Sequence, residues 1–239
     1  LIDGAEIAAE VMRMALLAPK DGKPSIAIGT GEPESDNMVY GYDYDSDGTY
    51  KQKHYLKIEG TDTWDHPDTA KPLKDVQQGT KYLKSIGVLP RYAMMNSTTF
   101  DYLVENEQIK NALITSSGKT VDFTDEATVK EIFTRKTGLT PIIYDKMYID
   151  YKGKTQKFYP DDKVTIIGAG TLGSTYYGVT PEERTLMSNK NVDVAMLDNR
   201  IAIATKTEQG PPIKTTTSVS QIVLPSYEGI DSTFVIDVK

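Results

Sequence analysis

The sequence contains no cysteine, a single tryptophan and only two histidines among its 239 residues. Without cysteine there can be no disulfide bond, no thiolate zinc site and no cysteine nucleophile. The two histidines, His54 and His66, lie in a polar region and have no partner at helical i, i+4 spacing. The pattern therefore favours solvated imidazoles over metal ligands or members of a catalytic triad.

Long apolar runs and clusters of basic residues are missing too. No run of about 20 apolar residues is present, which argues against a membrane-spanning segment. The formal net charge of -7 repels a phosphate backbone, so specific nucleic-acid binding is not expected. The chain starts at Leu1 without the pattern of a signal peptide, and we expect that a segment upstream of it has been removed.

Helical spacing of apolar residues marks the first part of the chain. We expect helices near residues 7–17, 69–86, 97–104 and 124–138, with a loop-rich β region over 20–62. Asp68 or Thr69 is expected to cap the second helix, with Pro72 in its first turn. Asn96 or Ser97 is expected to cap the third.

Strand signals dominate after residue 141, where apolar residues alternate between turn-forming residues. Strands are expected near residues 142–144, 147–151, 164–167, 194–197, 201–204 and 234–238. Asp198 and Asn199 are suited to a tight hairpin turn because both residue types tolerate positive φ. Helices mixed with antiparallel hairpins favour an α+β fold over a doubly wound α/β fold.

Two motifs suggest small-ligand sites. Gly168, Gly170 and Gly173 follow an apolar strand and match a dinucleotide-binding fingerprint, but Gly178 and Pro181 interrupt the helix that should follow. A glycine-rich turn between strands is the favoured interpretation, and no cofactor is expected.

Asp43, Asp45 and Asp47 precede Gly48 in the pattern that begins a calcium loop. The twelfth position of the loop is His54 where a bidentate Glu is required, so a solvated acidic turn is favoured over a metal site.

Five segments, in order along the chain, resemble the lambda-type major capsid protein E family of tailed phages. They are EVMRMALLAPKDGKPSI, TWDHPDTAKPLKDVQQGTKYLKSIG, RYAMMNSTTFDYLVENEQIKNAL, FYPDDKVTIIGAGTLGSTYYGVTPEE and QIVLPSYEGIDSTFVIDVK. The resemblance implies a Hong Kong 97-like (HK97-like) capsid fold, with a peripheral domain built on a long spine helix and an axial domain. By this resemblance we expect the N-terminal arm and extended loop of the family to be missing from the sequence.

The resemblance also implies domain boundaries. We expect residues 1–89 to form the first part of the peripheral domain, with the spine helix at about 69–86. Residues 90–212 would form the axial domain, and residues 213–239 would return as closing strands of the peripheral domain.

The function implied by the resemblance is structural, not enzymatic. The full-length protein would assemble with itself, as pentamers and hexamers, into an icosahedral virion head enclosing DNA, with scaffold, portal and decoration proteins as further partners. It would be made in the cytoplasm of the bacterial host. Tyr42, Tyr44, Tyr176 and Tyr177 are candidate subunit-interface residues because they lie in Gly-rich, aromatic segments that are not obviously core.

Two alternatives come from other classes of protein. The hairpins, the 15 tyrosines and the acidic loop would also suit a tail-associated or adhesin-like binding module, which predicts a β-sandwich without a long helix at 69–86. A nucleotide-binding enzyme using Gly168–Gly173 requires a helix from Gly170 onward.

Overall fold

A computed structural model of the chain describes residues 2–19, 22–28, 38–41, 54–117, 125–150, 152–186, 192–208 and 210–239. The chain divides into two compact units. The larger unit comprises residues 14–172 and 229–239, and the smaller comprises residues 1–13 and 173–228. The division falls within the first helix, α1 (Ile2–Leu17).

The larger unit is built on a five-stranded mixed sheet of order β3-β14-β8-β4-β5. Its strands are β3 (Tyr55–Lys57), β14 (Thr233–Asp237), β8 (Lys163–Gly168), β4 (Pro90–Met95) and β5 (Thr140–Ile143). Strand β14 runs parallel to β3 and antiparallel to β8, while β4 runs antiparallel to β8 and parallel to β5. The last strand of the chain therefore lies inside the sheet.

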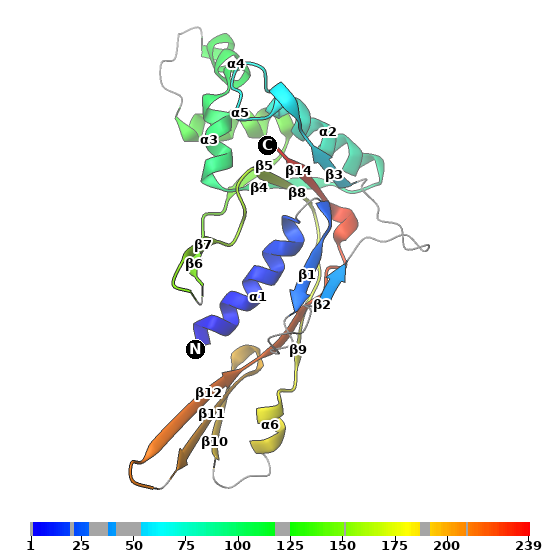
Figure 1. Cartoon of the computed structure of the whole chain (residues 1–239). Helices are drawn as coiled ribbons and strands as arrows, with labels where there is room; N and C mark the ends of the chain where they lie inside the picture. Colours follow the sequence, from blue (N-terminus) through cyan, green and yellow to red (C-terminus); the bar gives the residue numbers. More distant parts are fainter. Residues whose placement is uncertain are drawn as a thin grey trace. The chain divides into compact units, whose positions relative to one another are not determined.

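Helices cover one face of this sheet (Figure 1). They are α2 (Pro72–Ser85), α3 (Ser97–Glu105), α4 (Glu107–Ser117) and α5 (Glu126–Thr137). Alternate residues of the central strands, such as Ala93, Ile166 and Phe234, face these helices and are buried with Leu83 and Phe133. The apolar residues that alternate along the strands and the apolar stripes of the helices therefore pack together in one core.

Helix α2 lies close against the sheet at Gly79. A Cβ atom at this position would be 2.7 Å from both Ile166 Cδ1 and Phe234 Cδ1. The helix begins at Pro72 and the residue at its N-cap position is Lys71, so the prediction that Asp68 or Thr69 caps it is wrong. Trp64, in the loop before α2, is buried and donates to Asp75 Oδ2 at 3.0 Å.

The opposite face of the sheet carries Tyr159, whose hydroxyl bonds to Met94 O and Thr165 Oγ1. Thr165 Oγ1 in turn donates to Leu17 O at the end of α1. The remaining elements of the unit are β1 (Ser25–Ile28) with β2 (Met38–Gly41), β6 (Met147–Ile149) with β7 (Thr155–Lys157), η3 (Gly60–Asp62) and η5 (Ile230–Ser232).

The smaller unit holds a three-stranded antiparallel sheet and a two-stranded ladder. Its elements are β9 (Thr175–Gly178), α6 (Pro181–Leu186), β10 (Val192–Leu197), η4 (Asp198–Arg200), β11 (Ile201–Glu208), β12 (Lys214–Ser220) and β13 (Ile222–Pro225). The hairpin predicted at Asp198 and Asn199 is confirmed, and it is Arg200 that takes positive φ, at 54°.

The α+β class predicted from the sequence is confirmed. The helix at α2 contradicts the β-sandwich required by the adhesin-like alternative. The boundaries between the two compact units lie near residues 13, 173 and 229. The predicted boundaries between the peripheral and axial domains lie at residues 90 and 213. Helix α2 and strand β8, assigned by the sequence to different domains, share one core.

We predict that Leu83→Ala lowers the free energy of unfolding by about 3 kcal/mol, because this fully buried side chain leaves a cavity between α2 and the sheet. Lys81→Ala, on the exposed face of the same helix, should change it by less than about 0.5 kcal/mol. Chemical denaturation measures both values. Equal effects of the two substitutions would contradict the packing of α2 described above.

Candidate subunit-interface surfaces and a polar cluster

The ladder of β9 and β13 presents an exposed apolar face. Tyr176 lies opposite Leu224 and Gly178 lies opposite Ile222, so these positions share one side of the ladder. Tyr176 is 57% exposed, and Leu224 and Ile222 are exposed as well. The Tyr176 hydroxyl is within 3.4 Å of Glu228 Oε1. This is the kind of surface that a partner could cover.

Tyr177 points to the other side of the ladder, opposite Val223, and is half-buried. The two adjacent tyrosines therefore differ in exposure, which the sequence alone could not show. Tyr42 and Tyr44 lie outside the described residues. A subunit-interface role for these four residues stays a prediction.

The glycine-rich segment after β8 does not lead into a helix. Gly170 has φ of 124° and Gly173 has φ of 155°, and the next element is strand β9. Gly173 meets the backbone of Ser226 so closely that a Cβ atom there would overlap Ser226 O. The favoured interpretation, a turn between strands, is confirmed, and the helix N-terminus that would bind a pyrophosphate is not at this place.

The acidic motif of Asp43, Asp45 and Asp47 lies outside the described residues, so its interpretation as a solvated turn stays a prediction. Within the part of the chain that the structure describes, no group of three or more His, Asp or Glu residues is arranged to hold a metal ion.

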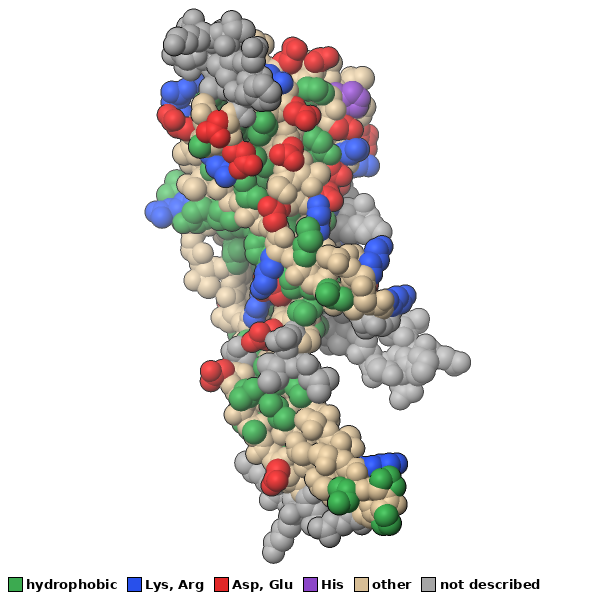
Figure 2. Space-filling model, turned by 90° about the vertical axis from the view of Figure 1, so that its left-hand side faces the viewer, with side chains coloured by type: hydrophobic (Ala, Val, Ile, Leu, Met, Phe, Trp, Pro, Cys, Tyr) green, Lys and Arg blue, Asp and Glu red, His purple; other side chains and the backbone are tan. Residues whose placement is uncertain are grey.

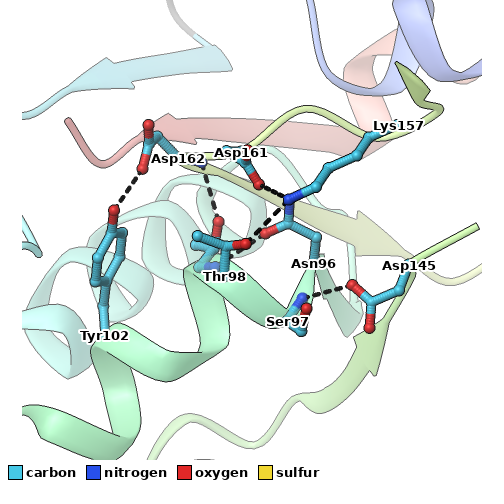
Figure 3. Close-up of polar contacts among 9 residues, drawn as sticks. Asn96, Ser97, Thr98, Tyr102, Asp145, Lys157, Asp161 and Asp162 are labelled. Carbon is cyan, nitrogen blue, oxygen red and sulfur yellow. Dashed lines mark hydrogen bonds and ion pairs between the residues drawn. The ribbon is translucent and has the colours of Figure 1, made fainter. Parts of the chain in front are cut away.

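A cluster of polar side chains surrounds the N-terminus of α3 (Figure 3). Asn96 is fully buried, and its Oδ1 accepts from Thr99 N at 2.9 Å, which confirms the predicted cap. Its Nδ2 donates to Asp161 Oδ1 at 2.5 Å. Lys157 Nζ donates to the same carboxylate at 2.6 Å and to Thr98 Oγ1 at 3.0 Å. One carboxylate thus joins the α3 cap to the segment before β8.

The same helix end receives two further contacts from distant segments. Ser97 N donates to Asp145 Oδ1 at 2.7 Å, and Asp162 N donates to Thr99 Oγ1 at 3.0 Å. Tyr102 donates its hydroxyl proton to Asp162 Oδ1 at 2.9 Å. Burial, followed by this hydrogen bond and the nearby carboxylate charge, raises the pKa of Tyr102 to about 12.

Asp161 is under opposing influences. Burial acts to raise its pKa, but hydrogen bonds from Lys157 and Asn96, together with the charge of Lys157, outweigh burial and hold the pKa below its usual value. The donors and acceptors of this cluster satisfy one another, and no nucleophile is paired with a base in it. The cluster therefore has a structural role, which is to hold the N-terminus of α3 against the segments that carry Asp145 and Asp161. The sequence indicated the Asn96 cap but gave no signal for its long-range partner Asp161, or for Lys157, which donates to the same carboxylate.

None of the described helices has the length and apolar character needed to cross a bilayer. Several solved structures resemble this chain, and two of them are phage-related proteins. One is a protein of Escherichia coli CFT073 assigned as the capsid protein of a prophage, with 14% sequence identity and a TM-score of 0.63 over 100% of this chain. The other is a phage-related protein of Bordetella bronchiseptica RB50, with 13% sequence identity and a TM-score of 0.49. The match covers 82% of this chain and 58% of the Bordetella protein.

The first of these structures shows that the chain shares its mixed α+β fold with a protein assigned to a phage capsid. This chain spans 64% of that protein's length. No curated protein matches the chain. The sequence model of phage major capsid protein E matches residues 6–193, which is more than half of the chain. The chain therefore belongs to the phage major capsid protein E family, as its sequence predicts.

We predict that Asp161→Asn destabilises the protein at pH 7 and that the difference from wild type shrinks as the pH falls below about 4. A carboxylate whose folded-state pKa is depressed contributes stability above its unfolded pKa, and it loses that contribution as the pH falls through its folded pKa. Thermal melts of both proteins between pH 3 and pH 7 measure the difference. Asp193→Asn, at an exposed strand position, is the control. A constant difference between wild type and Asp161→Asn across this range would contradict the assignment.

Proposed function

We propose that this protein is a structural subunit that self-assembles into the icosahedral head shell of a tailed phage or prophage. The observation that carries the proposal is the match of residues 6–193 to the phage major capsid protein E family. The shared fold with the Escherichia coli protein supports it. Membership of this family implies a structural role rather than catalysis and a location in the virion.

We also propose that the fold is of the HK97 type. A division into two units suits the peripheral and axial domains of such a subunit. The larger unit, with mixed helices and strands, is the candidate axial domain, and the smaller unit is the candidate peripheral domain. On this proposal α2 belongs to the axial domain because it packs on β8 and β14. Helix α1, the longest of the described helices at 16 residues, then becomes the candidate spine helix.

The partners follow from the proposed assembly. Pentamers and hexamers of the full-length protein would form the shell in the host cytoplasm, and scaffold, portal and decoration proteins would act during or after that assembly. The net charge of -7 suits a shell that leaves packaged DNA free to move. Of the alternatives, the nucleotide-binding enzyme is disfavoured because β9 occupies the place of the required helix.

The direct test of the proposed function is to express the protein at the full length of its natural gene and to examine it by electron microscopy. Closed particles of uniform size are the expected result, because closure around symmetry axes multiplies many modest contacts. A protein that stays monomeric under all assembly conditions would overturn the proposal.

We predict that Tyr176→Ser in the full-length protein lowers the yield of closed particles several-fold. The substitution removes an exposed aromatic ring from the face that it shares with Leu224. Particle yield is measured by sedimentation and microscopy, and thermal melts show whether the subunit still folds.

Tyr177→Ser is the matched comparison for Tyr176→Ser. It removes a half-buried ring from the other side of the same strand, so it should lower the melting temperature more. Normal particle yield with Tyr176→Ser would remove this residue from the interface.

A further inference from the structure

The solvent-facing side of α2 carries a line of lysines. Lys74 and Lys81 are exposed two helical turns apart, with exposed Gln78 between them. Exposed Lys71 and Lys84 lie at the two ends of the helix. Among the described residues, none of these lysines has a carboxylate within ion-pair distance. We call this set of four lysines the lysine face.

The acidic residue closest in sequence, Asp75, forms no ion pair with the lysine face. Asp75 is half-buried, and its carboxylate accepts the indole proton of Trp64. Burial is the largest influence on this carboxyl and raises its pKa above the ordinary value, whereas the hydrogen bond from Trp64 and the charges of Lys74 and Lys71 act to lower it. Four exposed lysines against one half-buried carboxylate leave the lysine face with a net positive charge.

A second surface of the same unit is acidic. Asp101 and Glu105 are exposed one turn apart on α3, where like charges repel each other. Glu126, in the first turn of α5, and Asp145, after β5, lie close enough to act on Asp101. Burial, and then repulsion from Glu126, Glu105 and Asp145, raises the pKa of Asp101. We call these four residues the acidic face.

Positive charge near the acidic face is limited. Lys130 Nζ lies 3.4 Å from Glu126 Oε2 and 5.4 Å from the ring centre of Phe100. Asp145 accepts the Ser97 N–H. Figure 2 looks onto the side of the larger unit where α3 lies in Figure 1, and acidic side chains gather there. Repulsion among these carboxylates is therefore only partly compensated within one subunit.

The two faces do not meet within a subunit. Helix α5 contacts both α2 and α3, and Gln77 Nε2 on α2 donates to Lys136 O at the end of α5. Figure 1 shows α3 and α2 on either side of the larger unit. Since both helices belong to one compact unit, the separation of the faces is a property of its fold.

We propose that the lysine face on α2 of one subunit docks against the acidic face on α3 and α5 of a second copy of this chain. The contact is heterologous, because one surface meets a different surface of the identical partner, and such contacts close into rings when the rotation between neighbouring subunits divides a full turn evenly. Complementary charge steers the encounter and disfavours wrong registers. Docking also places a positive surface beside carboxylates that repel one another. The inference rests on the proposed self-assembly and specifies one contact within it.

The test uses charge reversal in the full-length protein. Lys74→Glu with Lys81→Glu makes the lysine face acidic, and Asp101→Lys with Glu105→Lys makes the acidic face basic. Each double variant alone should associate about 10-fold more weakly than wild type, because it places like charges in contact. An equimolar mixture of the two variants should regain association, because every contact between unlike variants joins opposite charges.

Sedimentation velocity and electron microscopy measure association, and thermal melts confirm that each variant folds. Lys154→Glu with Lys214→Glu makes the same change of net charge at exposed positions outside both faces and should assemble as wild type does. Raising the salt concentration from 0.1 M to 1 M should weaken association of the wild type, since exposed charge pairs are screened.

Three results would overturn the inference. The first is wild-type association by the lysine-face variant, and the second is failure of the mixture to restore association. The third is loss of binding to a DNA duplex by that variant without any change in assembly, which would make α2 a nucleic-acid surface. If wild type forms shells while charge reversal has no effect, the proposed function stands and only the docking contact fails. If wild type does not associate at all, both fail.

Discussion

The structure depends on the placement of the last strand inside the main sheet, between β3 and β8. Strand β14 pairs with β3 on one side and with β8 on the other, so residues about 180 positions apart in sequence become neighbours. Asp237 fixes this position, because its carboxylate accepts from Lys163 Nζ at 3.0 Å and from the Tyr55 hydroxyl at 2.9 Å. The ion pair is mostly buried, so replacing either Lys163 or Asp237 alone by a neutral residue would leave the charge of the other buried and uncompensated.

This placement makes the smaller unit largely an insertion between two antiparallel neighbours, β8 and β14. The chain leaves the sheet after Gly168 and returns before Thr233. On the larger unit's side, Gly229 N donates to Leu172 O at 2.8 Å, and a Cβ at Gly229 would lie 2.9 Å from Leu172 Cα. Glycine there permits the two connecting segments to lie in contact. Gly173 of the dinucleotide-like motif lies in a similarly close contact with the backbone of Ser226, so the path of the chain accounts for this glycine.

Local features were predictable from the sequence, and long-range pairings were not. Periodicity and the Gly138 stop located α5, and Asn96 identified the start of α3, because caps and apolar stripes are encoded within a few residues. Helix α4 was missed because it follows α3 directly, although Asn106 between them signals its start: the Asn106 Oδ1 accepts from Gln108 N and Ile109 N. The Asp161 partner of Asn96, and the different exposures of Tyr176 and Tyr177, depend on pairings distant in sequence that a single sequence does not reveal.

On the larger unit, the positive lysine face and the negative acidic face are separate, and this separation affects how subunits of a shell can associate without aggregating. A subunit of uniformly negative surface would repel its copies, and a large apolar patch would bind them in many orientations. Exposed lysines along the solvent side of α2, and carboxylates gathered on α3 and at the start of α5, favour attraction in a restricted set of orientations. Exposed charge pairs contribute little energy each. Contacts of this strength can form and dissociate before closure, which lets a misplaced subunit leave a growing shell.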